Sequence, residues 1–240
     1  SMTEKPALRV AFVYLTEPHQ CFHTAAVAYE LAREPGFEIQ LIYNDPACVP
    51  VLARIGSLYP DNNVTMRPLA RPLLDVLRPL LPSRLRSLKL PLLWRNRRLL
   101  NGFDAIVVPE RTTTILRRMG VRRPRLIHIP HGVGDRAKGF EPRIRLFDFV
   151  LPGGPKDAAR MLDMGLIRPA HHAVPGYVKL ETVRRLLAAS QHAAPLFANE
   201  RPIVLYNPHF DLSLSSWSAC ARSIIEAFQA QDRYNLVFAP

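Results

Sequence analysis

The chain has 240 residues, of which 48% are hydrophobic, and a formal net charge of +12 at pH 7. This length and composition predict a soluble, globular α/β protein with one complete core and part of a second. Three cysteines at no metal-ligand spacing exclude a zinc site of the usual Cys/His type and indicate ordinary thiols in a reducing compartment. The apolar run at residues 7–15 is too short for a signal peptide or a spanning helix, so we expect a cytoplasmic protein.

Strands and helices are expected to alternate along the first 190 residues. Residues 8–15 form a nearly continuous apolar run, which is typical of a strand covered on both faces. Residues 21–33 carry apolar side chains at helical spacing, and Pro35 and Gly36 end the helix. The other expected strands are residues 37–43, 63–66, 103–109, 125–129, 147–151 and 172–177, and the other expected helices are residues 50–58, 112–119, 156–164 and 179–190. This order predicts a doubly wound parallel sheet.

A second β-α-β unit is expected after a linker at residues 191–201. Its strands are residues 202–206 and 235–238, and its helix is residues 215–229. Because about 40 residues cannot enclose a core of their own, we expect a truncated second domain. The sequence thus predicts an α/β fold with two Rossmann-like parallel-sheet domains, residues 1–190 and residues 202–240.

Residues 67–100 form a basic, leucine-rich insertion in the first domain. Between Arg67 and Arg98 there are nine cations and a single carboxylate, Asp75, so this segment supplies +8 of the net charge. Cations interleaved with leucine and one tryptophan favour contact with an anionic membrane surface. The alternative is a subdomain that packs its leucines inward; nucleic acid is not expected, because the aromatic side chains of a stacking platform are missing. The residues expected at the membrane are Arg84, Arg86, Lys89, Trp94, Arg95, Arg97 and Arg98.

The loop after the expected strand at residues 125–129 gathers the most reactive side chains. Residues 131–139 read His-Gly-Val-Gly-Asp-Arg-Ala-Lys-Gly, at the edge of the sheet where open α/β folds bind ligands. Its glycines let the backbone approach a ligand, and its two cations favour an anionic one. The spacing matches neither a dinucleotide fingerprint nor a phosphate loop, and a solvated glycine-rich turn is the alternative.

Other loops are expected at the same edge. His19 and His23 flank the loop after the first strand and are candidates for holding an acceptor; alternatively, each is a surface or helix-capping histidine. Gly153 and Gly154 precede a helix whose N-terminal amides could receive an anion, or they shape a tight turn. Carboxylates are scarce around these loops, so no metal and no cofactor is expected.

Two such domains with a basic projection resemble the GT-B transferases, and three motifs narrow the resemblance. His131-Gly132, Asp148-Phe149-Val150-Leu151 and the run from Ile203 to Pro208 are similar to the CDP-glycerol glycerophosphotransferase family, which are peripheral membrane enzymes that polymerise teichoic-acid-type chains. The resemblance covers roughly residues 100–240. It implies a bacterial enzyme on the inner face of the membrane that transfers glycerol phosphate, or a related polyol phosphate, from CDP-glycerol to a hydroxyl of an envelope glycan or lipid-linked acceptor.

The resemblance also implies roles for individual residues. The first domain would hold the acceptor and the second the nucleotide donor. His131 would take the acceptor proton, Asp135 would orient the imidazole, and Arg136 would balance phosphate charge. The donor would contact Lys138, Gly132, Gly134, Gly153, Gly154, Asn207, His209, Ser215 and Ser216.

Other functions remain open from the residues alone. A glycosyltransferase with a nucleotide-sugar donor and a sugar-nucleotide epimerase share the expected fold. A non-catalytic module that binds lipid or polyanions would use the basic insertion alone. Because the donor domain is expected to be incomplete, the 240-residue chain is expected to have little or no activity.

Overall fold

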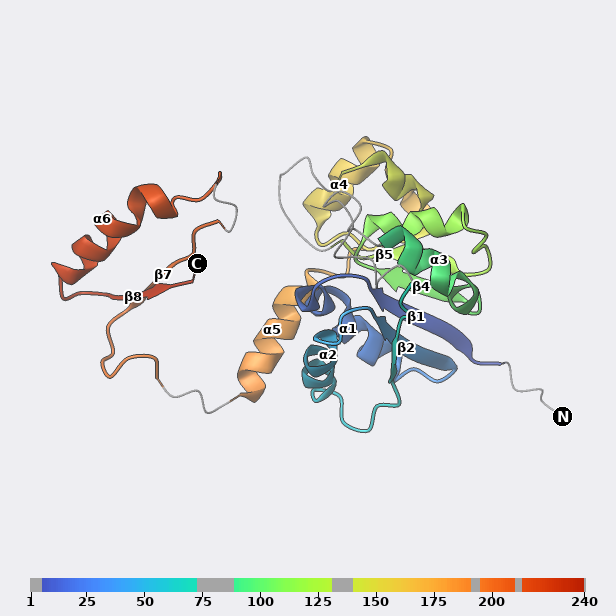
Figure 1. Ribbon diagram of the computed structural model, residues 1–240, viewed down its shortest axis with the longest axis horizontal. Coiled ribbons are helices and arrows are strands. Elements are labelled where there is room, and N and C mark those ends of the chain that lie inside the picture. The colour runs from blue at the N-terminus through green and yellow to red at the C-terminus, as the bar shows by residue number, and fades with distance from the viewer. Residues whose placement is uncertain (1–5, 73–88, 131–139, 191–194, 210–212, 240) are drawn as a thin grey trace. The chain divides into compact units, whose positions relative to one another are not determined.

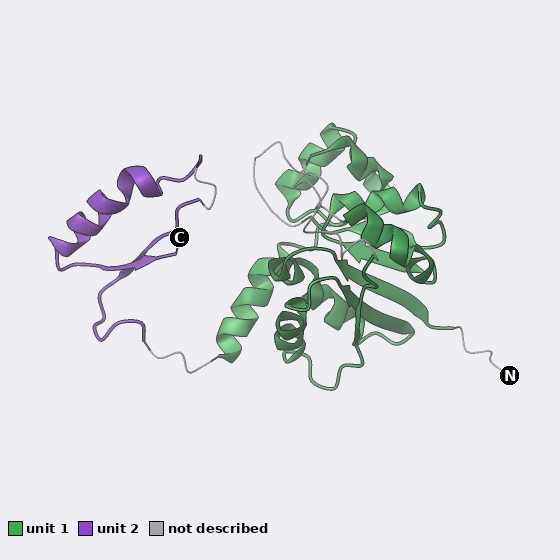
Figure 2. Ribbon diagram, viewed as in Figure 1, with its two compact units in different colours: residues 1–190 green, residues 191–240 purple. Residues whose placement is uncertain are grey.

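The computed structural model describes residues 6–72, 89–130, 140–190, 195–209 and 213–239. The chain divides into two compact units, Ser1–Ser190 and Gln191–Pro240, here called unit 1 and unit 2 (Figure 2).

Unit 1 is built on a six-stranded parallel sheet with the order β3-β2-β1-β4-β5-β6 (Figure 1). Its strands are β1 (Leu8–Tyr14), β2 (Phe37–Tyr43), β3 (Thr65–Pro68), β4 (Ala105–Val108), β5 (Arg125–His128) and β6 (Phe149–Val150). After β1, the chain adds β2 and β3 on one side of β1, and then β4, β5 and β6 on the other side. The order therefore reverses between β1 and β4, and open α/β sheets bind ligands outside the carboxyl ends of the strands at such a reversal.

Helices cover both faces of this sheet. The helices are α1 (Cys21–Leu31), α2 (Cys48–Gly56), α3 (Lys89–Leu100), α4 (Pro155–Asp163) and α5 (Val178–Ala189), with short 3-10 turns η1 (Pro18–Gln20), η4 (Arg111–Arg117), η5 (Pro142–Leu146) and η6 (Pro169–His171). Successive side chains of β1 point to opposite faces of the sheet, as in any strand, and so pack in two different hydrophobic cores. Phe12 and Tyr14 pack with α1 and α2, whereas Ala11 and Val13 pack in the core that contains the leucines of α3.

Three local expectations need correction. Residues 112–119 were expected to form an α-helix, but residues 111–117 form the 3-10 turn η4, in which Thr113 Oγ1 donates to Glu110 O over 2.8 Å. Such hydroxyl bonds to the preceding turn compete with regular helix. Residues 172–177 form no strand beyond one bridge between Val150 and His172, because Pro175 lacks an N–H and Gly176 has a φ of +95°. Helix α3 was not predicted, although Pro91 lies in its first turn, where proline is tolerated.

Unit 2 is a single β-α-β unit. Strands β7 (Ile203–Tyr206) and β8 (Asn235–Phe238) pair in parallel, and α6 (Trp217–Gln229) connects them. The rings of Tyr206, Trp217 and Phe238 pack together with centroids 5.4 to 6.2 Å apart. The predicted α/β fold with two parallel-sheet domains, the second of them partial in this chain, is therefore confirmed. No helix in the described part of the chain is both long and apolar enough to cross a membrane.

Candidate functional site

Glu110, Thr16 and Lys89 meet at the carboxyl edge of the sheet, where the strand order reverses. Thr16 lies just beyond β1, Glu110 just beyond β4, and Lys89 opens α3. Thr16 Oγ1 donates to Glu110 Oε1 over 2.6 Å, and Lys89 Nζ lies 2.6 Å from Glu110 Oε2. Burial of a carboxylate is costly unless donors surround it, so the two bonds are what allow this side chain to be only 6% exposed.

The cluster is open to a ligand on the side of the cation. The Lys89 side chain is 32% exposed, and its ammonium has three N–H donors, one of which serves Glu110. The others can bind a phosphate or carboxylate oxygen. Each oxygen of Glu110 has lone pairs beyond those used by Thr16 and Lys89, and these can accept a sugar or polyol hydroxyl. The arrangement is suited to a substrate that carries both hydroxyls and an anion.

Two cysteines and a tyrosine near this edge are buried. Cys21 begins α1 and Cys48 begins α2, and both are fully buried. A hydrogen bond to Cys48 and burial raise the pKa of the Cys21 thiol. Burial likewise raises the pKa of Tyr14, whose hydroxyl accepts a 2.7 Å bond from Thr24. In the described part of the chain, no group of three or more His, Cys, Asp or Glu side chains could hold a metal ion.

The most reactive loop predicted from the sequence lies outside the described residues. It comprises His131, Gly132, Gly134, Asp135, Arg136 and Lys138. The basic residues Arg84 and Arg86 lie outside the described residues as well. Their roles stay predictions.

The two histidines after β1 differ in exposure. His19 is exposed, with Nδ1 3.2 Å from Glu17 Oε2, whereas His23 is 3% exposed within α1. Their rings are 6.4 Å apart at the carboxyl edge. His23 is thus not the surface residue of the alternative interpretation, and contact with an acceptor stays a prediction for both.

The predicted phosphate contacts are placed on two separate elements. Gly153 and Gly154 lead into α4, where Pro155 occupies the first helical position and leaves that turn one N–H short. In unit 2, Asn207 is exposed and His209 is partly buried. Ser215 Oγ accepts from Trp217 N over 3.2 Å, and Ser216 Oγ lies 2.8 Å from the Tyr206 hydroxyl. Donor binding stays a prediction for all of them.

Helix α3 divides the basic insertion into a buried and an exposed face. Leu92, Leu93 and Leu100 are buried in the core, as the inward-packing alternative expected. Trp94 is 52% exposed, and the Arg97 guanidinium lies 3.9 Å above its ring. Arg95 and Arg98 are exposed on the same helix. Lys89 holds Glu110, a role that the sequence analysis missed, and membrane contact stays a prediction for the exposed residues.

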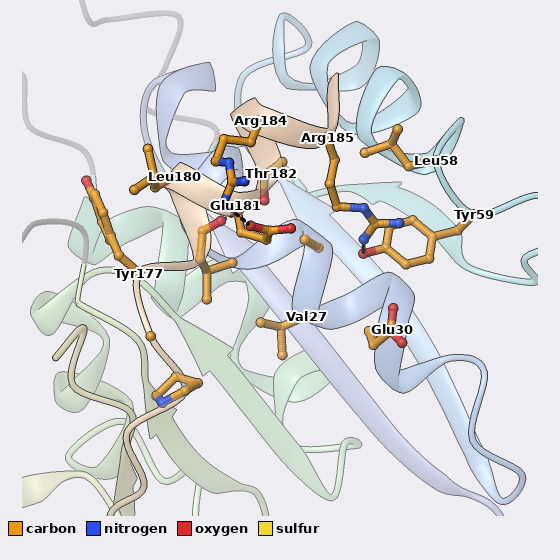
Figure 3. A pocket seen from close by; sticks show the side chains of 14 residues that line it. Val27, Glu30, Leu58, Tyr59, Tyr177, Leu180, Glu181, Thr182, Arg184 and Arg185 are labelled. Atoms are coloured by element: carbon orange, nitrogen blue, oxygen red, sulfur yellow. Dashed lines mark hydrogen bonds and ion pairs between the residues drawn. The ribbon is translucent and has the colours of Figure 1, made fainter. Parts of the chain in front are cut away.

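A further cavity of about 670 Å³ lies between α1, α5 and the segment after α2 (Figure 3). Val27, Leu58 and Leu180 form the apolar part of its wall. The Arg185 guanidinium lies 4.7 Å from the centre of the Tyr59 ring and donates to the Tyr59 hydroxyl. The wall from α1 comes from the second half of that helix, whereas the carboxyl edge of the sheet lies at its beginning. This cavity is therefore distinct from the Glu110 cluster.

The comparisons with known proteins concern the fold. No protein-family model matches the chain, and no curated protein matches it in sequence. A solved UDP-GlcNAc 2-epimerase from Neisseria meningitidis, bound to UDP-GlcNAc, is similar with a TM-score of 0.69 and 15% identity over 96% of this chain and 65% of that chain. For the UDP-N-acetylglucosamine 2-epimerase from Rickettsia bellii, the TM-score is 0.59 at 10% identity, over 98% of this chain and 62% of that chain.

A plant protein has the same arrangement. UGT2 from Phytolacca americana, complexed with UDP-2-fluoro-glucose and pterostilbene, is similar with a TM-score of 0.54 and 12% identity over 99% of this chain and 72% of that chain. The chain spans less than two thirds of the length of the two epimerases. The predicted GT-B fold is thus confirmed, while these structures do not bear on the CDP-glycerol family.

Proposed function

We propose that the chain belongs to an enzyme that acts on a nucleotide-diphosphate-activated sugar, and that unit 1 binds substrate at the carboxyl edge beside Glu110. The observation that carries the proposal is the buried Glu110 carboxylate, held by Thr16 and Lys89 where the strand order reverses. The ligands in two of the similar structures, UDP-GlcNAc and UDP-2-fluoro-glucose, support a nucleotide sugar.

In this proposal, one set of residues positions the substrate and another set carries out the chemistry. Glu110 accepts a substrate hydroxyl and so positions it, while Lys89 neutralises a nearby phosphate. His131, which follows β5 in the sequence, is the proposed general base, because an imidazole with an ordinary pKa near 6.5 accepts a hydroxyl proton at neutral pH. Asp135 orients that ring, and Arg136 and Lys138 balance the charge that develops on phosphate.

Glycerol phosphate transfer from CDP-glycerol is the second candidate. It is favoured by the His131-Gly132 motif and by the run from Ile203 to Pro208. The two candidates differ in the atom attacked, since a glycosyltransferase attacks the anomeric carbon and releases UDP, whereas glycerol phosphate transfer attacks phosphorus and releases CMP. An envelope glycan or lipid-linked acceptor at the inner membrane face belongs to this second candidate.

Nucleotide binding and release separate these possibilities. The chain is titrated with UDP-GlcNAc, UDP-glucose and CDP-glycerol by calorimetry, and UDP and CMP are quantified in parallel with lipid and glycan acceptors. Binding is measured beside turnover because the chain spans 62% to 65% of the two epimerases. Preference for UDP-sugars supports the leading proposal and preference for CDP-glycerol the second; absence of binding by all three donors refutes both.

A matched pair of variants locates the site. Glu110→Gln removes the charge at the carboxyl edge and should weaken donor or acceptor binding by roughly tenfold, as expected for one charged hydrogen bond. Glu38→Gln is the control, because Glu38 also pairs with a cation, Arg9 at 3.6 Å, but lies at the amino end of β2. Equal effects of the two changes would refute a site at Glu110.

A further inference from the structure

A cavity of about 620 Å³ opens where α3, η4 and η5 meet. Three cations, Lys89, Arg118 and Arg143, line it together with Thr112 and Thr114, and the Thr114 hydroxyl is already committed to Arg111 O over 3.0 Å. No acidic side chain is among the described residues that form its wall. A cavity with this lining is attractive to an anion.

The charges of this cavity are only partly neutralised. Lys89 is paired with Glu110, and Arg143 with Glu141. The exposed Arg118, at the end of η4, makes no ion pair with any described residue. Its guanidinium has five N–H donors in a planar fork that matches a phosphate. Among the described residues, the cavity therefore offers the guanidinium of Arg118 without an ion pair, with Thr112 in the same wall.

The mouth of the cavity is apolar. Leu90 and Leu146, which line it from α3 and η5, are 49% and 56% exposed. Trp94 follows Leu90 by one helical turn and is 52% exposed, so it extends the same apolar stripe along α3. Exposed leucine and tryptophan beside arginine are typical of groups that contact the acyl region and headgroups of lipid.

We infer that this cavity binds a lipid phosphate, with the phosphate on Arg118 and the Thr112 hydroxyl and the hydrocarbon chain over Leu90 and Leu146. A free inorganic anion would leave the leucines in water, and an uncharged hydrocarbon would leave the guanidinium without a counter-charge. Only a ligand that carries both groups satisfies both parts of the wall. The cavity shares Lys89 with the Glu110 cluster, but the inference concerns lipid binding alone and assigns the phosphate to Arg118 and Thr112, which the proposed function does not use.

Trp94 provides the readout. The chain has two tryptophans, so Trp217→Phe leaves Trp94 as the single tryptophan, excited at wavelengths that tyrosine does not absorb, while keeping an aromatic ring in unit 2. Dodecyl phosphate, below its micellar concentration, should bind saturably and shift the Trp94 emission to the blue, because the alkyl chain removes water from the indole. Decyl phosphate should bind more weakly, by about two- to fourfold for each methylene lost.

Two competitors and three variants test the two halves of the ligand. Arg118→Ser should weaken dodecyl phosphate binding roughly tenfold or more, as expected for a charged hydrogen bond, and Leu146→Ser should remove much of the chain-length dependence. Arg54→Ser is the matched control, since Arg54 is also exposed and without an ion pair among the described residues, but lies on α2. Inorganic phosphate that binds as tightly as dodecyl phosphate would overturn the inference, and so would dodecyl maltoside that gives the same blue shift. Equal effects of Arg118→Ser and Arg54→Ser would overturn it as well.

Discussion

Removal of the Lys89 ammonium should destabilise unit 1 through Glu110. Lys89→Met keeps most of the apolar stem of the side chain but leaves the carboxylate, 6% exposed, with the Thr16 hydroxyl as its donor among the described residues. Breaking a fully buried pair costs about 3–5 kcal/mol. Because Lys89 is 32% exposed, water can partly replace its ammonium, so we expect a loss of about 2–3 kcal/mol in the free energy of unfolding.

A double-mutant cycle with Glu110→Gln isolates the pair. The glutamine keeps the shape and can still accept from Thr16, so the double variant should be more stable than the sum of the single losses, with a coupling energy of about 1–2 kcal/mol. The measurement is urea unfolding followed by far-UV circular dichroism. Lys179→Met on α5 is the control and should lie within about 0.5 kcal/mol of the parent. Additive losses, or a Lys89→Met protein as stable as this control, would refute the reasoning.

Three further predictions concern other parts of unit 1 and the thiols. Gly56→Ala should lower the free energy of unfolding by about 1–3 kcal/mol in chemical denaturation, because its Cβ would lie 2.7 Å from the Tyr29 hydroxyl, which donates to Leu52 O; unchanged stability would contradict the close packing. Iodoacetamide should label the exposed Cys220 in the native protein and reach the buried Cys21 and Cys48 only in urea. Labelling of all three cysteines in the native protein, measured by mass spectrometry, would contradict this prediction. Asp104 accepts bonds from Arg9 N and Arg123, which lower its pKa below the usual 3.8. Its stabilising effect is therefore present above that value and lost as the pH falls through the lower, folded-state pKa, so Asp104→Asn should make the acid loss of the thermal midpoint shallower; an identical pH profile would contradict this.

Local apolar patterns predicted most strands, because a strand that is buried on both faces has an uninterrupted run of apolar residues. The run at residues 8–15 matches β1 to within one residue, and residues 37–43 and 235–238 match β2 and β8. Elements whose conformation depends on particular hydrogen bonds were predicted less well. The threonine hydroxyls of η4 and the turn at Pro175 and Gly176 decide the backbone there, and neither alters the apolar pattern.

The candidate site was harder to predict than the fold because its contacts span the sequence. Thr16 and Glu110 are 94 residues apart, and Lys89 lies in a segment whose charge pattern indicated a membrane surface. The one sequence signal for this site is a carboxylate, Glu110, directly after the buried strand expected at residues 103–109. The GT-B fold was predicted from the order of strands and helices. Because the apolar patterns gave this order correctly, the fold prediction was confirmed.

Chemical-shift mapping with nucleotide donors tests the central claim most directly. Isotope-labelled chain is titrated with UDP-GlcNAc, UDP and CDP-glycerol, and the amide resonances of Thr16, Glu110 and Lys89 are followed together with those of Tyr59 and Arg185 in the other cavity. We predict saturable shifts at the carboxyl edge that are strongly weakened in Glu110→Gln and unchanged in Glu38→Gln. Shifts confined to the Tyr59 and Arg185 cavity, or no shifts in unit 1 with any of the three nucleotides, would contradict the account.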